Sequence, residues 1–279
     1  MNFYCANHSF EKANFIIAGV PYDGTSSFRP GSRFAPNAIR EASYGIESYS
    51  PYLNKDLRDI KICDMQDIPL SFGDKEFNLH IIESFSYKFL KGRKKLLSIG
   101  GEHLITYPII KSVYKKYKDL TVLHIDAHSD LIDSYRGEKL SHASVMRRVA
   151  EIIGFENLYQ LGIRSLNKSD KFLPFRDKNM CLFDFSKAEE YLEIIGDRPL
   201  YVSLDLDVLD PSIFCGTGTP EPGGVTYKEL VNLLQLLQHS NIVGADVVEL
   251  SPHYDNSGVS SVTAASAVRE LLLAMDLRS

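Results

Sequence analysis

Short apolar runs, rich in β-branched residues, recur along the chain and predict the strands of a sheet. Segments with helical periodicity separate many of these runs. Near-continuous apolar strands that alternate with helices are typical of a mostly parallel sheet covered on both faces. The eight runs span residues 14–20, 59–65, 95–99, 121–127, 157–163, 179–185, 199–207 and 241–250.

Capping residues mark the ends of several predicted helices. Ser141 is a plausible N-cap for one helix, and Gly154 follows its last residue, as expected for a glycine C-cap. Thr226 and Glu229 have the spacing of a capping box at the start of another helix. The predicted helices cover residues 141–153, 226–237 and 258–277, and one short helix begins near Pro36.

Two architectures accommodate eight parallel strands, an open three-layer sheet and a TIM barrel. The connection over residues 21–58 is long, rich in Gly, Pro and Tyr, and holds one short helix. The gap between residues 163 and 179 is too short for a full-length crossover helix. These connections favour an α/β fold with an open three-layer α/β/α arrangement. No linker or internal repeat divides residues 1–279, so we expect a single domain.

Composition and charge narrow the classes of function. The chain is 44% hydrophobic and 24% charged, with a formal net charge of -5 and no long basic run. This balance argues against a nucleic-acid partner and suits a small cationic molecule.

No apolar run approaches the roughly 20 residues that span a bilayer, and the first residues lack the pattern of a secretory signal. The cysteines, which have no CxxC spacing, predict reduced thiols in the cytoplasm: Cys5, Cys63, Cys181 and Cys215.

Three polar clusters follow predicted strands and provide the ligands for a pair of metal ions. They are Gly100-Gly101-Glu102-His103, Asp126-Ala127-His128-Ser129-Asp130 and Asp205-Leu206-Asp207. Residues two apart in extended backbone point the same way, and the ends of parallel strands meet at one edge of a sheet. Four massed aspartates repel one another unless bound cations neutralise them. Mixed Asp/His ligation without Cys favours Mn²⁺, with Fe²⁺, Co²⁺, Ni²⁺ or Zn²⁺ as alternatives.

His124 shares the strand parity of Asp126 and His128 but lies one pleat deeper, about 6–7 Å back along the strand. We therefore expect His124 to support the cluster from the core and not to bind a metal ion.

Taken together, these motifs resemble the ureohydrolase family of arginases, agmatinases and their relatives. The resemblance runs through most of the chain and implies the arginase-like three-layer fold with an eight-stranded sheet and two Mn²⁺ ions. Besides the three clusters, the motifs that carry it are Gly19-Val20-Pro21-Tyr22-Asp23-Gly24-Thr25, Arg29-Pro30-Gly31-Ser32-Arg33-Phe34-Ala35-Pro36 with Ile39-Arg40, Gly216-Thr217-Gly218-Thr219-Pro220 and Asp246-Val247-Val248-Glu249-Leu250-Ser251-Pro252.

The resemblance also implies a role for each site residue. His103 and Asp130 complete one metal site, His128 and Asp207 complete the other, and Asp126 and Asp205 bridge the two ions. Glu249 engages the guanidinium group of the substrate, and His142 shuttles a proton near the leaving amine. Family members usually form trimers or hexamers, so the resemblance implies a homotrimer or homohexamer.

The resemblance further implies hydrolysis of a guanidino compound. Coordination to metal lowers the pKa of water toward about 7, so that a metal-bridging hydroxide can attack the guanidinium carbon at neutral pH. Asp130 can accept a hydrogen bond from that hydroxide and orient it. Protonation of the departing nitrogen, through His142, then releases urea and an amine.

Two positions outside the clusters favour agmatine as the substrate. Arginases place an Asn where this chain has Ile132, and an Asp where it has Asn167. Those side chains hold the carboxylate and amino group of arginine, which agmatine lacks. A guanidinobutyrate or guanidinopropionate hydrolase stays open, and would use a basic residue such as Arg33, Arg136 or Lys139. Arginase and formimidoylglutamase activities are less favoured, and a single-zinc deacetylase-like amidohydrolase is the alternative from another mechanistic class.

One segment departs from the family pattern. Relatives commonly have His-Gly-Thr after the second cluster, whereas this chain has His142-Ala143-Ser144. Loss of the glycine predicts that the loop around His142 runs differently from that of relatives.

Overall fold

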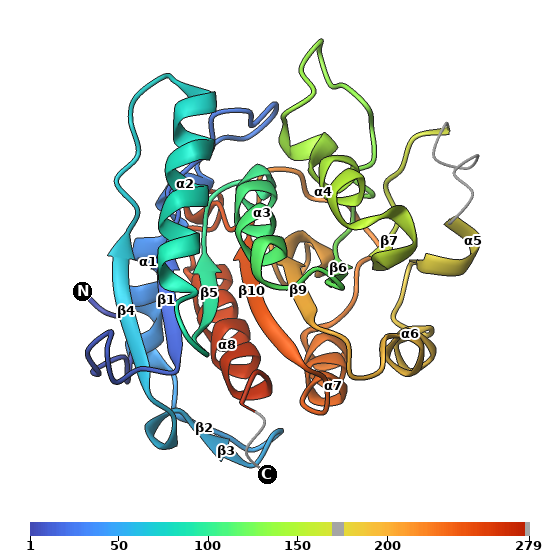
Figure 1. The fold of residues 1–279 in the computed structure, drawn as a ribbon. Coiled ribbons are helices and arrows are strands. Elements are labelled where there is room, and N and C mark those ends of the chain that lie inside the picture. Colours follow the sequence, from blue (N-terminus) through green and yellow to red (C-terminus); the bar gives the residue numbers. More distant parts are fainter. Residues whose placement is uncertain (169–175, 277–279) are drawn as a thin grey trace.

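One eight-stranded parallel sheet forms the centre of the computed structural model, which describes residues 1–168 and 176–276 (Figure 1). The strand order is β4-β1-β5-β10-β9-β6-β7-β8, and every neighbouring pair is parallel. β4 and β8 are free edges, so the open sheet is confirmed and the barrel is excluded. The strands, each within or beside one predicted apolar run, are β1 (Phe15–Gly19), β4 (Ile62–Asp67), β5 (Lys95–Ile99), β6 (Thr121–Ile125), β7 (Leu158–Ile163), β8 (Met180–Leu182), β9 (Leu200–Asp205) and β10 (Ile242–Val248).

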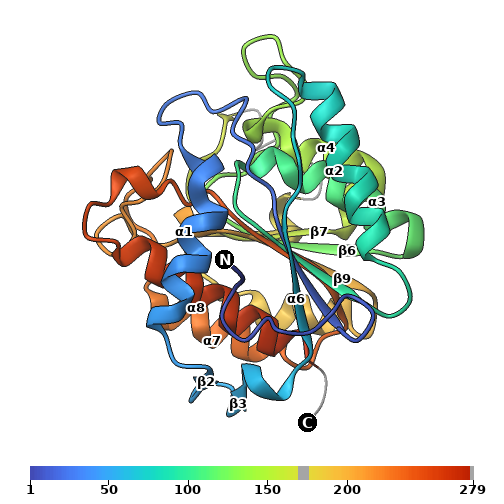
Figure 2. The same ribbon diagram turned by 90° about the vertical axis from the view of Figure 1, so that its left-hand side faces the viewer.

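Helices cover both faces of the sheet, as Figure 2 shows. Alternate residues of β1 enter opposite cores: Phe15 and Ile17 pack in one hydrophobic cluster, and Ile16 and Ala18 pack in the other. The first cluster includes side chains of α1 (Ala35–Ala42), α6 (Ala188–Ile195), α7 (Tyr227–Leu237) and α8 (Val259–Ala274). The second includes side chains of α2 (Lys75–Phe89), α3 (Thr106–Lys116) and α4 (Val145–Ile153). Because both cores share one sheet, we propose that the chain is one domain.

The predicted caps are present. Thr226 and Glu229 form a capping box at the start of α7. Ser141 forms a capping box with Ser144 at the start of a 3-10 turn over His142–Ser144, and α4 follows this turn directly. The last helix begins after Gly258, as predicted, but α8 ends at Ala274, and Leu277 lies outside the described residues.

Some elements went unpredicted because they are too short for a periodic pattern. A two-stranded hairpin, β2 (Tyr49–Ser50) with β3 (Lys55–Asp56), lies in the long connection before β4. The short helix α5 (Arg176–Asn179) precedes β8. The four cysteines are free thiols. No helix in residues 1–168 and 176–276 is long and apolar enough to cross a membrane.

A buried ion network joins α1 to β4. The Arg40 guanidinium donates to both oxygens of Asp64, at 2.9 and 3.0 Å, and to Asp67 at 2.6 Å. Replacing Arg40 with alanine leaves the Asp64 carboxylate buried without its cation, so we expect a loss of about 3–5 kcal/mol in the free energy of unfolding. Urea denaturation measures this loss. The matched control is Arg58→Ala, which removes an ion pair to Asp56.

The side chain of Arg58 is 70% exposed, so solvent screens its charge and its replacement should lower stability far less. Equal effects of Arg40→Ala and Arg58→Ala would contradict the structural role assigned to the buried network.

Candidate metal centre

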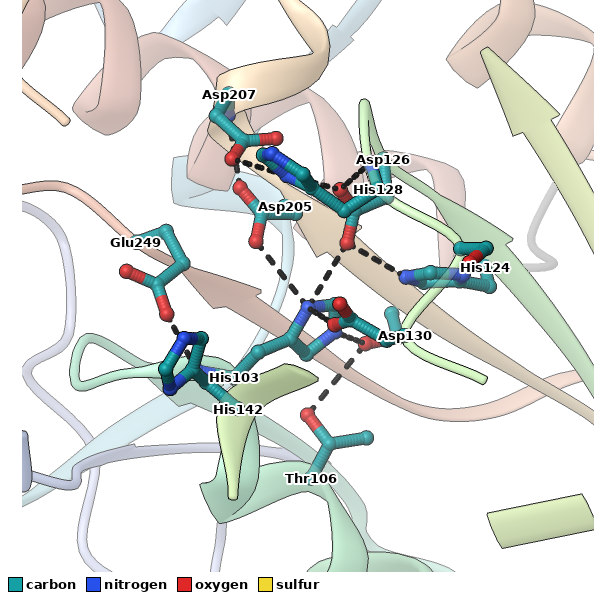
Figure 3. A network of polar contacts seen from close by, with 12 residues as sticks. His103, Thr106, His124, Asp126, His128, Asp130, His142, Asp205, Asp207 and Glu249 are labelled. Atoms are coloured by element: carbon teal, nitrogen blue, oxygen red, sulfur yellow. Dashed lines mark hydrogen bonds and ion pairs between the residues drawn. The ribbon is translucent and has the colours of Figure 1, made fainter. Parts of the chain in front are cut away.

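The three polar clusters meet where four neighbouring strands end (Figure 3). β5, β10, β9 and β6 lie side by side in the sheet. His103 follows β5, and Glu249 follows β10. The remaining aspartates and His128 lie at the ends of β6 and β9 or just beyond them. Ligands at the carboxyl ends of adjacent parallel strands converge on one point, so the predicted cluster forms from segments far apart in sequence.

The candidate metal ligands form two groups, and the first group surrounds the Nδ1 atom of His103. This atom lies 3.0 Å from Asp126 Oδ2, 3.3 Å from Asp130 Oδ2 and 3.2 Å from Asp205 Oδ2. It is buried and makes no hydrogen bond within the described part of the chain. One ring nitrogen cannot serve three carboxylates with a single proton. A divalent cation amid these four atoms would satisfy all of them.

The second group is built around His128. Its Nδ1 atom lies 3.0 Å from Asp207 Oδ2 and 3.5 Å from Asp126 Oδ1. Asp126 therefore turns one oxygen toward each group, as a bridging ligand would. Asp205 turns Oδ2 toward His103, while its Oδ1 accepts the Asp207 backbone N–H at 2.8 Å. A bridging role for Asp205 would have to use Oδ2.

The donor set fits two divalent cations. Burial, and then the charges of Asp126 and Asp207, raise the pKa of Asp205 well above its ordinary value. Bound cations would remove this repulsion. Imidazole nitrogens with carboxylate oxygens suit Mn²⁺ and related ions, and none of the cysteines belongs to the metal-binding groups found among the described residues.

Two site residues adopt the left-handed backbone region. Asp130 has φ of 52° and Glu249 has φ of 66°. Non-glycine residues rarely adopt this conformation, which costs on the order of 1–3 kcal/mol and persists where the surroundings enforce it. The fold thus holds both carboxylates in place at the expense of local strain, which no sequence pattern indicated.

A layer of buried residues orients the candidate ligands from behind. His124 lies 2.7 Å from Asp126 Oδ2 through Nε2, and its Nδ1 lies 2.8 Å from Gln160 Nε2. Both ring nitrogens have polar neighbours, yet His124 also belongs to a group with His103, Asp126 and Asp130 that could hold a metal ion. The supporting role expected for His124 therefore stays a prediction. On the other side, His103 Nε2 lies 2.8 Å from Ser203 Oγ, which donates to Asp246 at 2.7 Å. The polar residues behind His103 lie inside apolar strands, and that placement was the sequence signal that could have revealed their contacts with His103.

A cavity of about 280 Å³ opens onto the metal centre. Larger cavities lie elsewhere, up to about 590 Å³, but this one is lined by all the candidate metal ligands except Asp126. No lysine or arginine is among the described residues that line it. Its lining comprises four carboxylates, three histidines and small or hydroxylic side chains: Ser27, His103, His128, Asp130, Tyr135, His142, Ala143, Ser165, Asp205, Asp207, Thr219 and Glu249.

The three basic residues predicted as anchors for a substrate carboxylate lie outside this lining. Arg33 pairs with Asp23 and faces a different cavity, so it is not placed to hold a substrate carboxylate here. Arg136 stacks on Tyr135, with the guanidinium carbon 5.5 Å from the ring centroid. Arg136 thus contacts a residue of the pocket lining.

Ile132 and Asn167 do not line the pocket either. Ile132 is half-buried and Asn167 is exposed. Ser165, from the same turn as Asn167, does line the cavity, and so does Thr219 of the Gly216–Pro220 motif. Ser27 and Tyr135 also line it, and sequence reasoning missed both. These residues come from loops whose approach depends on tertiary contacts.

His142 lies in the pocket wall despite the change of its neighbour from glycine to alanine. Its Nδ1 lies 3.3 Å from Thr25 Oγ1, and its Nε2 lies 3.3 Å from Ser27 Oγ. Ala143 occupies the 3-10 turn over His142–Ser144 and is not among the residues with positive φ. The turn therefore needs no glycine there. Burial lowers the pKa of His142 below its ordinary value, although Asp130 opposes that shift.

Glu249 faces the pocket from the end of β10 and accepts the His103 backbone N–H at 2.7 Å through Oε1. Burial raises the pKa of this carboxyl from 4.5 to about 8, and the charge of Glu102 adds to the shift. In the metal-free protein the folded state therefore loses stability as pH rises from about 4.5 to about 8, because only the unfolded carboxyl ionises freely.

Glu249→Gln removes this ionisation, so the variant's Tm should exceed that of the unmodified chain by a margin that grows over the same pH range. Thermal unfolding in a chelator tests this at pH 4.5 and pH 8. Saturating Mn²⁺, which would neutralise the carboxylate, serves as the control and should shrink the margin. A Tm difference that stays the same between pH 4.5 and pH 8 would contradict the raised pKa assigned to Glu249.

Comparisons with known proteins agree with this geometry. The profile of the arginase family matches residues 13–274. The agmatinase of Bacillus cereus is 47% identical over 276 residues, which cover 97% of this chain and 95% of that protein. The crystal structure of the agmatine ureohydrolase of Thermoplasma volcanium superposes with a TM-score of 0.88 at 33% identity, over 98% of this chain and 94% of that one. The mitochondrial guanidino acid hydrolase of Homo sapiens is 33% identical, over 95% of this chain and 79% of that protein.

Proposed function

Because this chain belongs to the arginase family, we propose that it hydrolyses agmatine to urea and putrescine at the candidate metal centre. It is an enzyme of the agmatinase type. The observation that carries the choice of substrate is the pocket lining, which has four carboxylates and no lysine or arginine among its described residues. Three of these carboxylates are candidate metal ligands, which leaves Glu249 for the guanidinium, and the described lining offers no cation to hold a substrate carboxylate.

Two divalent cations bound by the His103 and His128 groups would lower the pKa of water from about 15.7 toward about 7 and supply a nucleophile at neutral pH. The protein itself contributes binding, orientation and proton transfer. Glu249 holds the guanidinium by a charge-assisted pair and so presents its carbon to attack. Asp130 accepts a hydrogen bond that orients the attacking water. His142, neutral at rest, takes up a proton and delivers it to the departing amine nitrogen.

The decisive experiment is a urea-release assay with a panel of substrates on the Mn²⁺-loaded protein. It compares agmatine, arginine, guanidinobutyrate and guanidinopropionate by kcat/KM. We expect agmatine to exceed arginine by at least about 100-fold, because arginine's carboxylate finds no partner in the pocket. Arginine as the best substrate would overturn the proposal.

A guanidino acid hydrolase is the second candidate, since Arg136 contacts the lining residue Tyr135 and the human relative carries that name. Replacing Arg136 with glutamine distinguishes the two. An agmatine hydrolase should keep its kcat/KM for agmatine or improve it, because the substitution removes a positive charge that repels the cationic substrate near the pocket. A guanidino acid hydrolase should lose its carboxylate partner and about 10-fold or more in kcat/KM.

The finer features of the proposal follow the family resemblance. They are Mn²⁺ as the native metal, two ions per chain, a homotrimer or homohexamer, a cytoplasmic location and a role in polyamine biosynthesis. Metal analysis with native mass spectrometry tests the stoichiometry and the assembly. One zinc ion per chain at full activity would instead favour the deacetylase-like mechanism.

The buried network behind His103 leads to a prediction about metal affinity. Ser203→Ala removes the hydroxyl that holds His103 Nε2, so the Nδ1 lone pair is no longer fixed toward the cluster. We expect metal affinity to fall by about 10- to 100-fold, measured by equilibrium dialysis and metal analysis. Tyr201→Phe is the matched control, because it removes a hydrogen bond to Asp246 but none to His103. Equal losses of metal affinity in Ser203→Ala and Tyr201→Phe would mean that the effect comes from the lost contact with Asp246 and not from the release of His103.

A further inference from the structure

Glu102 is a fully buried carboxylate that neither lines the pocket nor belongs to the candidate ligands. It precedes His103 in the Gly-Gly-Glu-His turn and accepts hydrogen bonds from one loop. Thr25 donates its backbone N–H at 2.8 Å to Oε2 and its hydroxyl at 2.5 Å to Oε1. Ser26 donates its hydroxyl to Oε2 at 3.2 Å. Three donors thus converge on Glu102, and the site described above gives it no function.

The Thr25 hydroxyl connects this carboxylate to His142. Its Oγ1 accepts the His142 backbone N–H at 3.1 Å and lies 3.3 Å from His142 Nδ1. A hydroxyl has one proton and two lone pairs. The Thr25 hydroxyl donates its proton to Glu102 Oε1, and one lone pair takes the backbone N–H of His142. The remaining lone pair faces Nδ1, so Nδ1 must carry the hydrogen of the neutral imidazole.

This arrangement leaves Nε2 as the nitrogen that exchanges protons. Nε2 lies on the pocket side, 3.3 Å from Ser27 Oγ, and both Ser27 and His142 line the cavity. A proton shuttle must present its basic nitrogen to the substrate. The tautomer that the Thr25 contacts select is the one that does so.

We propose that Glu102 is a positioning residue that acts through the Thr25 hydroxyl to fix His142 with its hydrogen on Nδ1 and its Nε2 aimed at the substrate. The proposal rests on the proposed function, since it assigns the support of the histidine that delivers the proton. Carboxylate, hydroxyl and imidazole form a chain in which each group fixes the proton of the next.

Glu102→Gln gives a sharp test because the amide has only one oxygen. The backbone N–H of Thr25 is an obligatory donor, so the amide oxygen takes the Oε2 position and the NH₂ group faces Thr25 Oγ1. The Thr25 hydroxyl then accepts from the amide and turns its proton toward His142 Nδ1. We therefore expect the variant to move the histidine hydrogen from Nδ1 to Nε2.

Nitrogen NMR of protein labelled with ¹⁵N-histidine reads this tautomer directly. The enzyme is loaded with diamagnetic Zn²⁺ and studied at pH 8, and His142→Gln assigns the signal. The unmodified chain should show hydrogen on Nδ1. Glu102→Gln should show it on Nε2, and Thr25→Val should show a mixture. Ser26→Ala, which leaves the Thr25 hydroxyl in place, and Thr25→Ser, which restores it, should match the unmodified chain.

Turnover supplies the second readout. Glu102→Gln and Thr25→Val should lower kcat by about 10- to 100-fold with little change in KM, because proton delivery and not binding is impaired. Hydrogen on Nε2 in the unmodified chain, or an unchanged tautomer in both variants, would overturn the proposal. The NMR measurement needs no substrate, so it stands apart from whether agmatine is hydrolysed. Should Glu102→Gln fail to fold, the Thr25 pair decides the question.

Discussion

Replacing Asp126 with alanine is expected to lower urea release by at least about 10³-fold, since metal-supplied nucleophile activation amounts to several kcal/mol of transition-state stabilisation. The reason lies in the position of the side chain. Asp126 turns Oδ2 toward His103 and Oδ1 toward His128. Its removal takes one donor from each candidate site at once. Steady-state assays at saturating Mn²⁺ measure the loss, and metal analysis should find fewer than two ions per chain.

The same substitution should unfold the protein very little. Asp126 is fully buried among other carboxylates, so in the metal-free protein its removal relieves repulsion as well as ending contacts to His124 and the His128 backbone. Thermal unfolding in a chelator provides the control and should show a comparable Tm for both proteins. Near-full turnover of the variant in metal-stripped buffer would refute the two-metal mechanism.

Replacing Glu249 with glutamine should lower kcat/KM for agmatine by about 10²- to 10³-fold. The amide keeps the length of the side chain and an acceptor for the His103 backbone N–H, but it removes the negative charge. Loss of one partner from a buried, hydrogen-bonded charge pair costs about 2–5 kcal/mol, and about 1.36 kcal/mol corresponds to tenfold in rate. The measurement is kcat/KM over a range of agmatine concentrations.

Glu249→Asp is the matched variant for this prediction, because it keeps the charge and shortens the reach by one methylene. A carboxylate pairs well with a guanidinium only when both charge and geometry are right. The kcat/KM of Glu249→Asp should therefore lie between that of the unmodified chain and that of Glu249→Gln. A loss below about fivefold for Glu249→Gln, with its metal content intact, would remove Glu249 from substrate binding.

Much of the fold could be predicted because local patterns and sheet geometry agree. Each apolar run became a strand of one sheet, and the capping residues at Thr226 and Ser141 mark helix starts. The strand order could not be predicted, because the pairing of β5 with β10 and of β10 with β9 joins segments far apart in sequence. That pairing brings His103, Glu249 and the aspartates together.

The substrate pocket was less predictable than the metal cluster. Ile132 and Asn167 favoured agmatine by the polar groups they lack, yet neither lines the pocket. Loops decide the lining, and the approach of Ser27 and Tyr135 to the ligands depends on long-range contacts such as those of Thr25 with Glu102. Arg33 illustrates the limit, since its buried partner Asp23 directs it to another cavity.

Local sequence patterns establish the eight strands and the kinds of ligand that follow them. These follow from backbone periodicity and side-chain chemistry, which are local. Long-range packing sets which atoms meet. It shares the two oxygens of Asp126 between His103 and His128, holds Asp130 and Glu249 in left-handed backbone, and links Glu102 to His142. Such contacts depend on strand order and loop packing, which are settled by the whole chain at once.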